Sequence, residues 1–311
     1  MQHYYSLDDV LLKDVWLTIG SFDGVHRGHQ AIINELTAGA HREGVPAVVL
    51  TFHPHPAVVL RKRKGPHYLT TPEERAVLLG DLGVDVVITH PFTPEVAALP
   101  AGDFMRVVKS HLGIKHLCVG HDFALGRRRE GDIAVLRQLG EELGYTLNVL
   151  PPVYLGDDIA SSSRIRAALA DGNVERARSL LGRPYQLGGD VIHGDGRGST
   201  LGIPTANLAV WPERIVPKTG VYACMADVDG KTWEAVTNIG VRPTFDHRTA
   251  STQIETHLLD FSKDLYQQRV ELSFVARLRD ERRFSGVQAL VSQIQLDIQL
   301  AREILVDNGI E

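Results

Sequence analysis

The feature that most constrains the fold is a series of short apolar segments that alternate with helical patterns in the first 150 residues. The segments lie at 15–20, 45–52, 84–90, 116–120 and 146–152. They are continuously apolar and rich in β-branched residues, which is typical of strands covered on both faces. Helix candidates lie between them, near 28–42, 72–82, 102–112 and 132–143. The alternation predicts an α/β fold with a parallel sheet, flanking helices and right-handed crossovers.

The composition and the hydrophobic pattern of the sequence change near residue 183. After two short helix candidates within 161–182, "GRPYQLGG" (182–189) begins a region dense in glycine and proline, in which strand-like runs such as "GVYACMADVDG" follow one another. The "DVDG" at 227–230 is a hairpin signal. This pattern predicts a small closed antiparallel β-barrel, followed by one amphipathic helix over 285–307. We therefore expect two domains, 1–182 and 183–311.

The composition narrows the classes of function. The net charge of −5 gives no reason to expect general binding to nucleic acid or to a membrane surface. No apolar run approaches the roughly 20 residues that span a bilayer, and the N-terminal "MQHYYSLDDV" lacks a signal-peptide pattern. Cys118 and Cys224 lie far apart in apolar runs. They indicate two reduced core thiols in a cytoplasmic protein rather than a disulfide or a metal site.

A glycine-containing turn follows the first of these strands in "LTIGSFDGVHRGHQ" (17–30). It lacks both the Gly-Lys-Ser/Thr ending of a Walker A loop and the G-x-G-x-x-G of a dinucleotide site. His26 and His29 are three residues apart, so in a helical first turn they face the same side. Because a helix N-terminus attracts phosphate and imidazoles add donors, the turn predicts a phosphate site. The alternatives are two surface histidines, or a zinc pair for which no third ligand is evident.

Two further segments favour phosphate. "VGHDFALGRRREGD" (119–132) follows a predicted strand and carries glycines and three arginines, although a solvated basic loop has the same composition. In "SSSRIRAAL" (161–169), the serines could simply cap a helix, but Arg164 and Arg166 add guanidinium donors suited to a polyphosphate. Because ligands of parallel sheets bind at the carboxyl ends of the strands, we expect these segments to converge there.

Together these segments resemble a known family. "GSFDGVHRGH" is similar to the H-x-G-H signature of the nucleotidylyltransferase superfamily. With "TFHPHP" (51–56), "VGHDFALG" and "SSSRIR", the first half closely resembles the N-terminal half of the bacterial bifunctional riboflavin kinase/FMN adenylyltransferases, or FAD synthetases. The resemblance implies a Rossmann-like domain in which the FMN phosphate attacks the α-phosphorus of MgATP and pyrophosphate leaves.

The resemblance also implies roles for single residues. It places His26 and His29 on the ATP phosphates, and it assigns the β/γ end of ATP to Ser162, Ser163 and Arg166. Asp23 would shape the nucleotide site, and His55 and Asp122 the flavin and nucleotide site. Two positions depart from the family pattern. Ser163 replaces a usual threonine and keeps its hydroxyl, whereas Leu125 replaces a frequent phenylalanine and calls an aromatic contact there into question.

The second half carries its own candidates. Glycines in "HGDGRGSTLGIPTANL" (193–208) let backbone N–H groups approach phosphate. Thr205 and Asn207 place two hard oxygen ligands on the same side of an extended chain, which suits Mg²⁺, although a plain loop and turn is the alternative. Glu255 lies in a strand-like run with Ile254 and Thr256 on the opposite face. It either faces solvent or, at the barrel mouth, serves as a general base.

These segments resemble the riboflavin kinase module of the same family, on the basis of "GRPY", "PTANL", "NIGVRPTF" and "ETHLLDF". The resemblance implies a six-stranded barrel in which Glu255 activates the ribityl 5′-hydroxyl for attack on the γ-phosphate. Thr205 and Asn207 would be the Mg-ATP ligands, and Gly196 and Gly198 would bind ATP. Gln267 departs from the family, which commonly has glycine after Leu-Tyr.

The leading hypothesis is an enzyme that phosphorylates riboflavin to FMN and adenylylates FMN to FAD. Its partners would be ATP, riboflavin and FMN, with Mg²⁺ accompanying ATP, no nucleic acid and no membrane; the oligomeric state stays open between a monomer and a weak homo-oligomer. In a second hypothesis the barrel only binds flavin, against which Glu255, Thr205 and Asn207 argue. An RNA-binding protein is disfavoured by the acidic charge, and a nicotinamide or pantetheine adenylyltransferase by the barrel.

Overall fold

The computed structural model describes residues 1–61, 66–156, 158–194, 202–242 and 251–307. These form two compact units, Met1–Ser162 and Ser163–Glu311.

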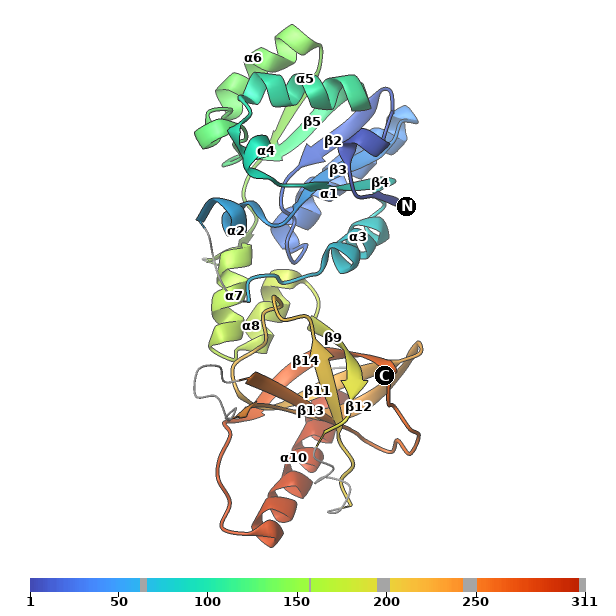
Figure 1. Ribbon diagram of the computed structural model, residues 1–311, viewed down its shortest axis with the longest axis vertical. Helices are drawn as coiled ribbons and strands as arrows, with labels where there is room; N and C mark the ends of the chain where they lie inside the picture. The colour runs from blue at the N-terminus through green and yellow to red at the C-terminus, as the bar shows by residue number, and fades with distance from the viewer. Residues whose placement is uncertain (62–65, 157, 195–201, 243–250, 308–311) are drawn as a thin grey trace. The chain divides into compact units, whose positions relative to one another are not determined.

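A six-stranded parallel sheet forms the centre of the first unit (Figure 1), with the strand order β1-β4-β3-β2-β5-β6. The strands are β1 (Gln2–Tyr4), β2 (Val15–Ile19), β3 (Ala47–His53), β4 (Val86–Pro91), β5 (Ile114–Gly120) and β6 (Thr146–Leu150). The five expected strands are confirmed, and every residue of β2 is buried, as its apolar run predicts. Strand β1 was not expected from the sequence, because three residues are too few to show a period.

Helices cover both faces of this sheet, and two apolar clusters lie between the layers. The helices are α1 (Arg27–Glu43), α2 (Pro56–Arg61), α3 (Pro72–Asp81), α4 (Pro94–Ala98), α5 (Ala101–Leu112) and α6 (Ile133–Leu143). The buried residues of α1 and α3 pack with Trp16 and Val49 on one face. Those of α5 and α6 pack with Leu17 and Leu50 on the other face. Because neighbours in a strand point to opposite faces, β2 and β3 contribute to both clusters.

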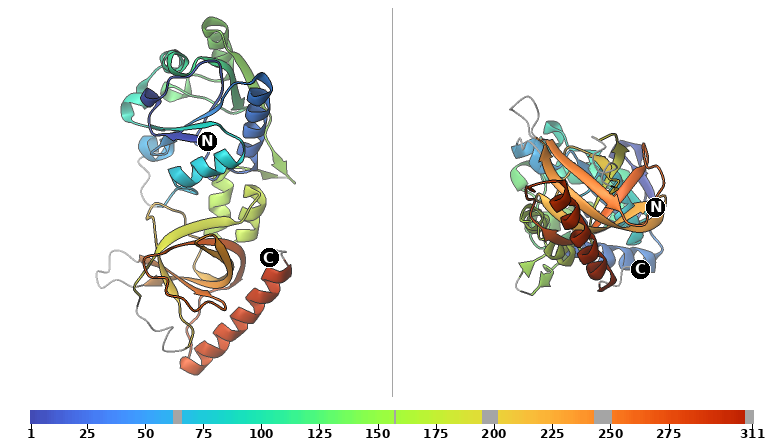
Figure 2. Two further views of the ribbon diagram at one scale, coloured as in Figure 1. Left: turned by 90° about the vertical axis from the view of Figure 1, so that its right-hand side faces the viewer. Right: turned by 90° about the horizontal axis from the view of Figure 1, so that it is seen from below.

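The second unit contains a closed antiparallel barrel (Figure 2). Its strand order is β10-β13-β12-β11-β14-β9. Its strands are β9 (Tyr185–Ile192), β10 (Ala206–Val210), β11 (Gly220–Val228), β12 (Lys231–Arg242), β13 (Ser251–Leu258) and β14 (Arg269–Arg279). The predicted hairpin joins β11 and β12 through Asp229 and Gly230, whose φ angles of 50° and 75° match a type I′ turn. Helix α10 (Val287–Asp307) lies along the outside of the barrel (Figure 2). It packs on Val221, Ala223 and Met225 of β11.

Two short helices precede the barrel, α7 (Ser162–Ala170) and α8 (Val174–Leu181). Most of α7 and all of α8 pack with the barrel unit. The Lys218 N–H donates to the Leu169 carbonyl at 2.9 Å, and the Arg277 N–H donates to Glu175 Oε1 at 3.3 Å. The structural division therefore falls between Ser162 and Ser163, whereas the first barrel strand begins at Tyr185.

Both cysteines are free and buried, as expected for core thiols. Burial raises the pKa of Cys118 and of Cys224 to about 12, so neither is a reactive thiolate near neutral pH. Within the described ranges, no group of three His, Cys, Asp or Glu side chains is arranged to hold a metal ion. In the same ranges, no helix is both long and apolar enough to cross a bilayer.

Candidate functional sites

The turn between β2 and α1 has an unusual backbone. Phe22, Gly24 and Val25 have φ angles of 47°, 82° and 42°, and only glycine enters this region without strain. Buried hydrogen bonds hold the turn. The Asp23 carboxylate accepts from the Leu69 N–H at 2.9 Å, and from the Thr70 N–H and hydroxyl at 3.1 and 3.2 Å. Asp23 is 1% exposed, so this carboxylate anchors the turn from within the core.

His26 is the N-cap of α1. Its Nδ1 accepts from the N–H groups of Gly28 at 3.2 Å and His29 at 3.4 Å. The His26 and His29 rings stack with centroids 3.6 Å apart, which confirms that the two histidines share one side. The helix itself begins at Arg27, so His26 precedes it. Two of the N–H groups expected to attract phosphate are thus already bound by His26.

Ser162 also supports this turn. Its hydroxyl donates to the Asp23 carbonyl at 2.9 Å. Close packing surrounds Gly28, because a Cβ at that position would lie 3.3 Å from the Ala160 carbonyl oxygen. Ser163 and Arg166 follow Ser162 within α7.

A buried polar chain beneath the turn was missed at the sequence level. The Thr51 hydroxyl donates to the Ser21 carbonyl at 3.0 Å and accepts from Arg75 Nη1 at 2.9 Å. Arg75 is fully buried, and burial lowers the pKa of its guanidinium while the Asp23 carboxylate opposes that shift. "TTPEER" signals the capping box of α3 at Thr71, but nothing in it signals that Arg75 turns inward.

The other expected residues of this unit lie on loops after β3 and β5, the two neighbours of β2. His55 Nδ1 accepts from the Ala57 N–H at 3.0 Å, and the His55 ring meets His67 edge-on, with centroids 4.9 Å apart. Asp122 is exposed, and its carbonyl accepts from Arg129 at 2.9 Å. Since β2, β3 and β5 are adjacent and parallel, the loops that carry Asp23, His55 and Asp122 leave the same edge of the sheet.

The loop after β5 closes on itself. Leu125 and Gly131 exchange backbone hydrogen bonds of 3.0 and 3.1 Å. Between them, Arg128 and Arg129 have φ angles of 54° and 62°. The three consecutive arginines therefore lie in an ordered, strained turn rather than in an irregular basic loop.

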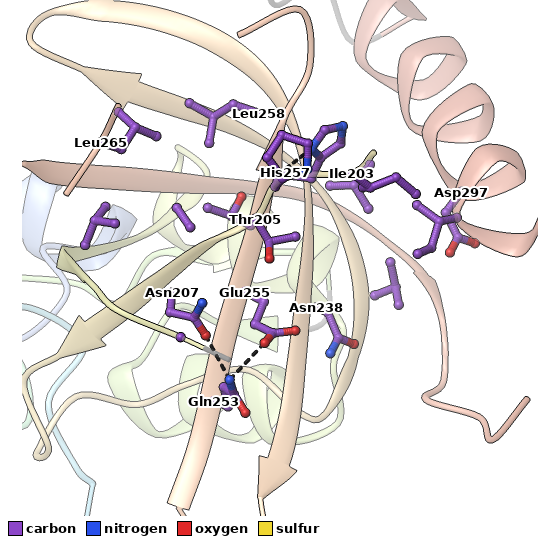
Figure 3. A pocket seen from close by; sticks show the side chains of 18 of the residues that line it. Ile203, Thr205, Asn207, Asn238, Gln253, Glu255, His257, Leu258, Leu265 and Asp297 are labelled. Atoms are coloured by element: carbon purple, nitrogen blue, oxygen red, sulfur yellow. Dashed lines mark hydrogen bonds between the residues drawn. The ribbon is translucent and has the colours of Figure 1, made fainter. Parts of the chain in front are cut away.

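The barrel unit carries a pocket of about 890 Å³ on the outer face of the barrel, beside α10 (Figure 3). Thr205, Asn207 and Glu255 all line it. The strand register explains why these residues meet, because Asn207 of β10 and Asn238 of β12 both lie directly opposite Glu255 of β13. Directly opposite residues share a face, so three polar side chains form a row across three strands.

The surroundings of Glu255 refine the sequence prediction. Ile254 and Thr256 are buried on the opposite face, as expected, and Glu255 is half-buried. It neither projects into open solvent nor lies at the barrel mouth, but points into the pocket on the outer face (Figure 3). A residue that the sequence analysis missed, Gln253, donates to both Asn207 Oδ1 and Glu255 Oε1 at 2.8 Å.

Beyond these residues the pocket combines apolar side chains with charged ones such as Lys263 and Arg282, and α10 closes it on one side. Ile203, Leu258 and Leu265 provide apolar surface, which suits a flat ring system. An ion pair between Arg279 and the buried Asp297, with hydrogen bonds of 2.7, 2.9 and 3.1 Å, attaches α10 to β14 beside the pocket. Gly196 and Gly198 lie outside the described residues.

Gln267 occupies a backbone conformation that favours glycine. Its φ is 64°, in the left-handed region, and its N–H donates to the Val191 carbonyl at 3.0 Å. A non-glycine residue pays roughly 1 kcal/mol or more for this conformation. The left-handed conformation of Gln267 therefore has a cost in stability that glycine would avoid.

Comparisons with known proteins agree with both halves. A family model described as FAD synthetase matches residues 9–164, and one described as riboflavin kinase matches residues 181–305. The bifunctional riboflavin kinase/FMN adenylyltransferase of Pseudomonas fluorescens is 41% identical over 92% of each chain. Those of Bacillus subtilis (strain 168) and Escherichia coli (strain K12) are each 39% identical over 92% of this chain and 90% and 91% of their own.

A solved structure shares the fold. A crystal structure described as that of a macrolide-efflux protein from Streptococcus pneumoniae has a TM-score of 0.87 at 29% identity, and it covers 96% of this chain and 98% of its own. That description applies to the other protein, and the similarity to this chain is one of fold. With two family models in the expected order and relatives matched over nearly their whole length, the chain belongs to the bifunctional riboflavin kinase/FMN adenylyltransferase family.

Proposed function

We propose that the chain makes FMN and then FAD. The barrel unit transfers the γ-phosphoryl group of ATP to riboflavin, and the first unit transfers the adenylyl group of a second ATP to FMN. The observation that carries this proposal is the row of Asn207, Glu255 and Asn238 in the barrel pocket. It supports a kinase because a module that only binds flavin needs neither a base nor a metal ligand there.

In the kinase reaction, Glu255 takes the proton of the ribityl 5′-hydroxyl as that oxygen attacks the γ-phosphorus. The bond from the γ-phosphorus to the bridging oxygen breaks, and ADP leaves. Thr205 and Asn207 offer the hard, neutral oxygens that fit a Mg²⁺ held jointly by protein, phosphates and water. The ion, when bound with ATP, neutralises phosphate charge. By family resemblance, Gly196 and Gly198 contribute backbone N–H groups to the phosphates.

In the adenylyl transfer, an oxygen of the FMN phosphate attacks the α-phosphorus, and pyrophosphate leaves without a covalent enzyme intermediate. The stacked rings of His26 and His29 lie at the N-terminus of α1, where anions are favoured. Asp23 and Ser162 hold the turn that carries them. From the family resemblance we assign phosphate binding to Ser163 and Arg166, and the flavin and nucleotide site to His55 and Asp122.

We further propose that the substrates are ATP, riboflavin and FMN, with no nucleic acid or membrane partner. The two free thiols are typical of proteins in the reducing cytoplasm, where we expect the chain to act.

The first test is a chromatographic time course of the full chain with riboflavin and MgATP. FMN should appear first, followed by FAD with pyrophosphate. If added FMN became FAD while riboflavin stayed unphosphorylated, the barrel would be a flavin-binding module. If FMN accumulated without FAD, the adenylyl-transfer assignment would be wrong.

Two variants separate the activities. Glu255→Gln should lower riboflavin phosphorylation by about 10² or more, because a general base is lost, and leave FMN adenylylation unchanged. His29→Ala should do the reverse. Glu213→Gln, which alters an exposed carboxylate outside the pocket, is the matched control. Equal loss of both activities in Glu255→Gln would contradict separate sites.

A further inference from the structure

We propose that Gln253 is a positioning residue of the kinase site, which holds Asn207 and Glu255 in their working orientation before substrates bind. The inference rests on the proposed function, since it takes Asn207 as a metal ligand and Glu255 as the base. Gln253 itself touches neither substrate nor metal in this scheme.

The first observation is a single amide group that bridges the two residues (Figure 3). Gln253 Nε2 lies 2.8 Å from Asn207 Oδ1 and 2.8 Å from Glu255 Oε1. An amide nitrogen carries two protons, so each oxygen receives one hydrogen bond. Both acceptors keep lone pairs for a further partner.

The barrel register produces this bridge. Gln253 and Glu255 are two residues apart on β13 and therefore share a face, and Asn207 lies directly opposite Glu255 on β10. Gln253 is thus a diagonal neighbour of Asn207, within reach of a long side chain. On its other side, Gln253 lies opposite Gly240 of β12. Glycine contributes no side chain there, and the Glu281 carboxylate occupies the space that one would fill.

The bridge decides which end of the Asn207 amide faces the pocket. An asparagine can present either its oxygen or its NH₂ group, and a carboxylate at the position of Glu255 favours the NH₂ group. If Asn207 turned that way, it would tie up Glu255 and withdraw the oxygen that a metal ion needs. The Gln253 NH₂ group donates one hydrogen bond to Glu255. Its second proton needs an acceptor, and only the oxygen of the Asn207 amide, not its NH₂ group, can accept it. Gln253 therefore fixes the orientation of both side chains.

The test compares Gln253→Met with the full-length wild type. Methionine keeps the length of the side chain but cannot donate. We expect the Mg²⁺ concentration that gives half-maximal riboflavin phosphorylation to rise about tenfold, as is typical when a partner of a metal ligand is lost. FMN adenylylation in the same samples should be unchanged, and Thr252→Val, on an exposed neighbour in β13, should match the wild type.

A double-mutant cycle separates orientation from general damage. An aspartate at position 207 presents an oxygen whichever way it turns. In the Asn207→Asp background, Gln253→Met should therefore have little further effect on the Mg²⁺ requirement. An equal rise in both backgrounds would mean that Gln253 acts through packing, and it would overturn the proposal. Gln253→Ala, which removes the same donor with a different volume, must give the same pattern.

A readout without turnover is the side-chain amide NMR signal of Asn207, followed during Mg²⁺ titration in the presence of ADP. In Gln253→Met the titration midpoint should move to higher Mg²⁺, in parallel with the kinetic shift. Wild-type behaviour of Gln253→Met in both measurements, with Glu255→Gln inactive as a kinase, would overturn this inference alone. A kinase-active Glu255→Gln would instead overturn the proposed function.

Discussion

At the scale of the residue, His26 has two possible duties that the structure allows to be separated. Its Nδ1 caps α1 by accepting from Gly28 and His29, and its ring stacks on His29 at the predicted phosphate site. Capping belongs to stability, whereas contact with ATP belongs to catalysis. A side chain that caps without an imidazole can distinguish the two.

We predict that His26→Ala lowers the free energy of unfolding of the first unit by about 1 kcal/mol, the usual cost of a lost N-cap. His26→Asn should restore that stability, because asparagine caps well. Adenylylation should fall in both variants if the imidazole contacts ATP. Denaturant unfolding and FMN adenylylation assays measure the two effects. Full recovery of activity in His26→Asn would show that His26 serves only as the cap.

At the scale of the element, the turn after β2 depends on support from segments distant in sequence. Thr51 at the end of β3 holds the Ser21 carbonyl, and Arg75 of α3 holds Thr51. Asp23 is held by the segment before α3, at Leu69 and Thr70. The turn proposed to bind phosphate is therefore positioned by β3 and by the region around α3, as well as by its own sequence.

We predict that Thr51→Val destabilises the first unit by about 1 to 3 kcal/mol, because it removes a fully buried hydroxyl that both donates and accepts. The KM for ATP in adenylylation should rise as the turn loses its support, and riboflavin phosphorylation should be unaffected. Thr51→Ser keeps the hydroxyl and is the control. Thermal unfolding and steady-state kinetics are the measurements; a stable Thr51→Val with normal KM would remove Thr51 from this role.

The elements themselves were largely predictable. The strands and long helices of the first unit follow from local periodicity, and α3 and α6 begin at the capping residues Thr71 and Asp132. Short elements such as β1 and α4 were missed, since a few residues show no period. In the barrel, β10 was expected only as an extended stretch around Thr205 and Asn207, because five residues after a glycine-rich segment give a weak strand signal.

At the scale of the whole molecule, the position of α7 and α8 defines the folding units. Both helices contribute buried residues, including Leu169, Val174 and Leu181, and hydrogen bonds join them to Lys218 and Arg277 of the barrel unit. A barrel that begins at residue 183 would lack these partners. The functional division that we propose near 183 and the packing division at 162 are therefore different boundaries.

We predict that a fragment of residues 163–311 folds cooperatively and phosphorylates riboflavin, whereas a fragment of residues 183–311 is less stable. The shorter fragment leaves the apolar surface beneath α7 and α8 exposed, which costs about 25 cal/mol per Å². The measurements are the thermal unfolding midpoint and the riboflavin kinase activity of each fragment. Equal stability would mean that α7 and α8 add nothing to the barrel.

The sequence by itself determined the layered first unit, the barrel, the two activities and most candidate residues, because periodicity, turn residues and motifs are local properties. Only the tertiary structure decided which distant residues meet. The buried anchors of Asp23, the inward turn of Arg75 and the bridge of Gln253 all depend on pairing between segments far apart in the chain. The alignment of Asn207, Glu255 and Asn238 depends on strand register, which is set by closure of the whole barrel.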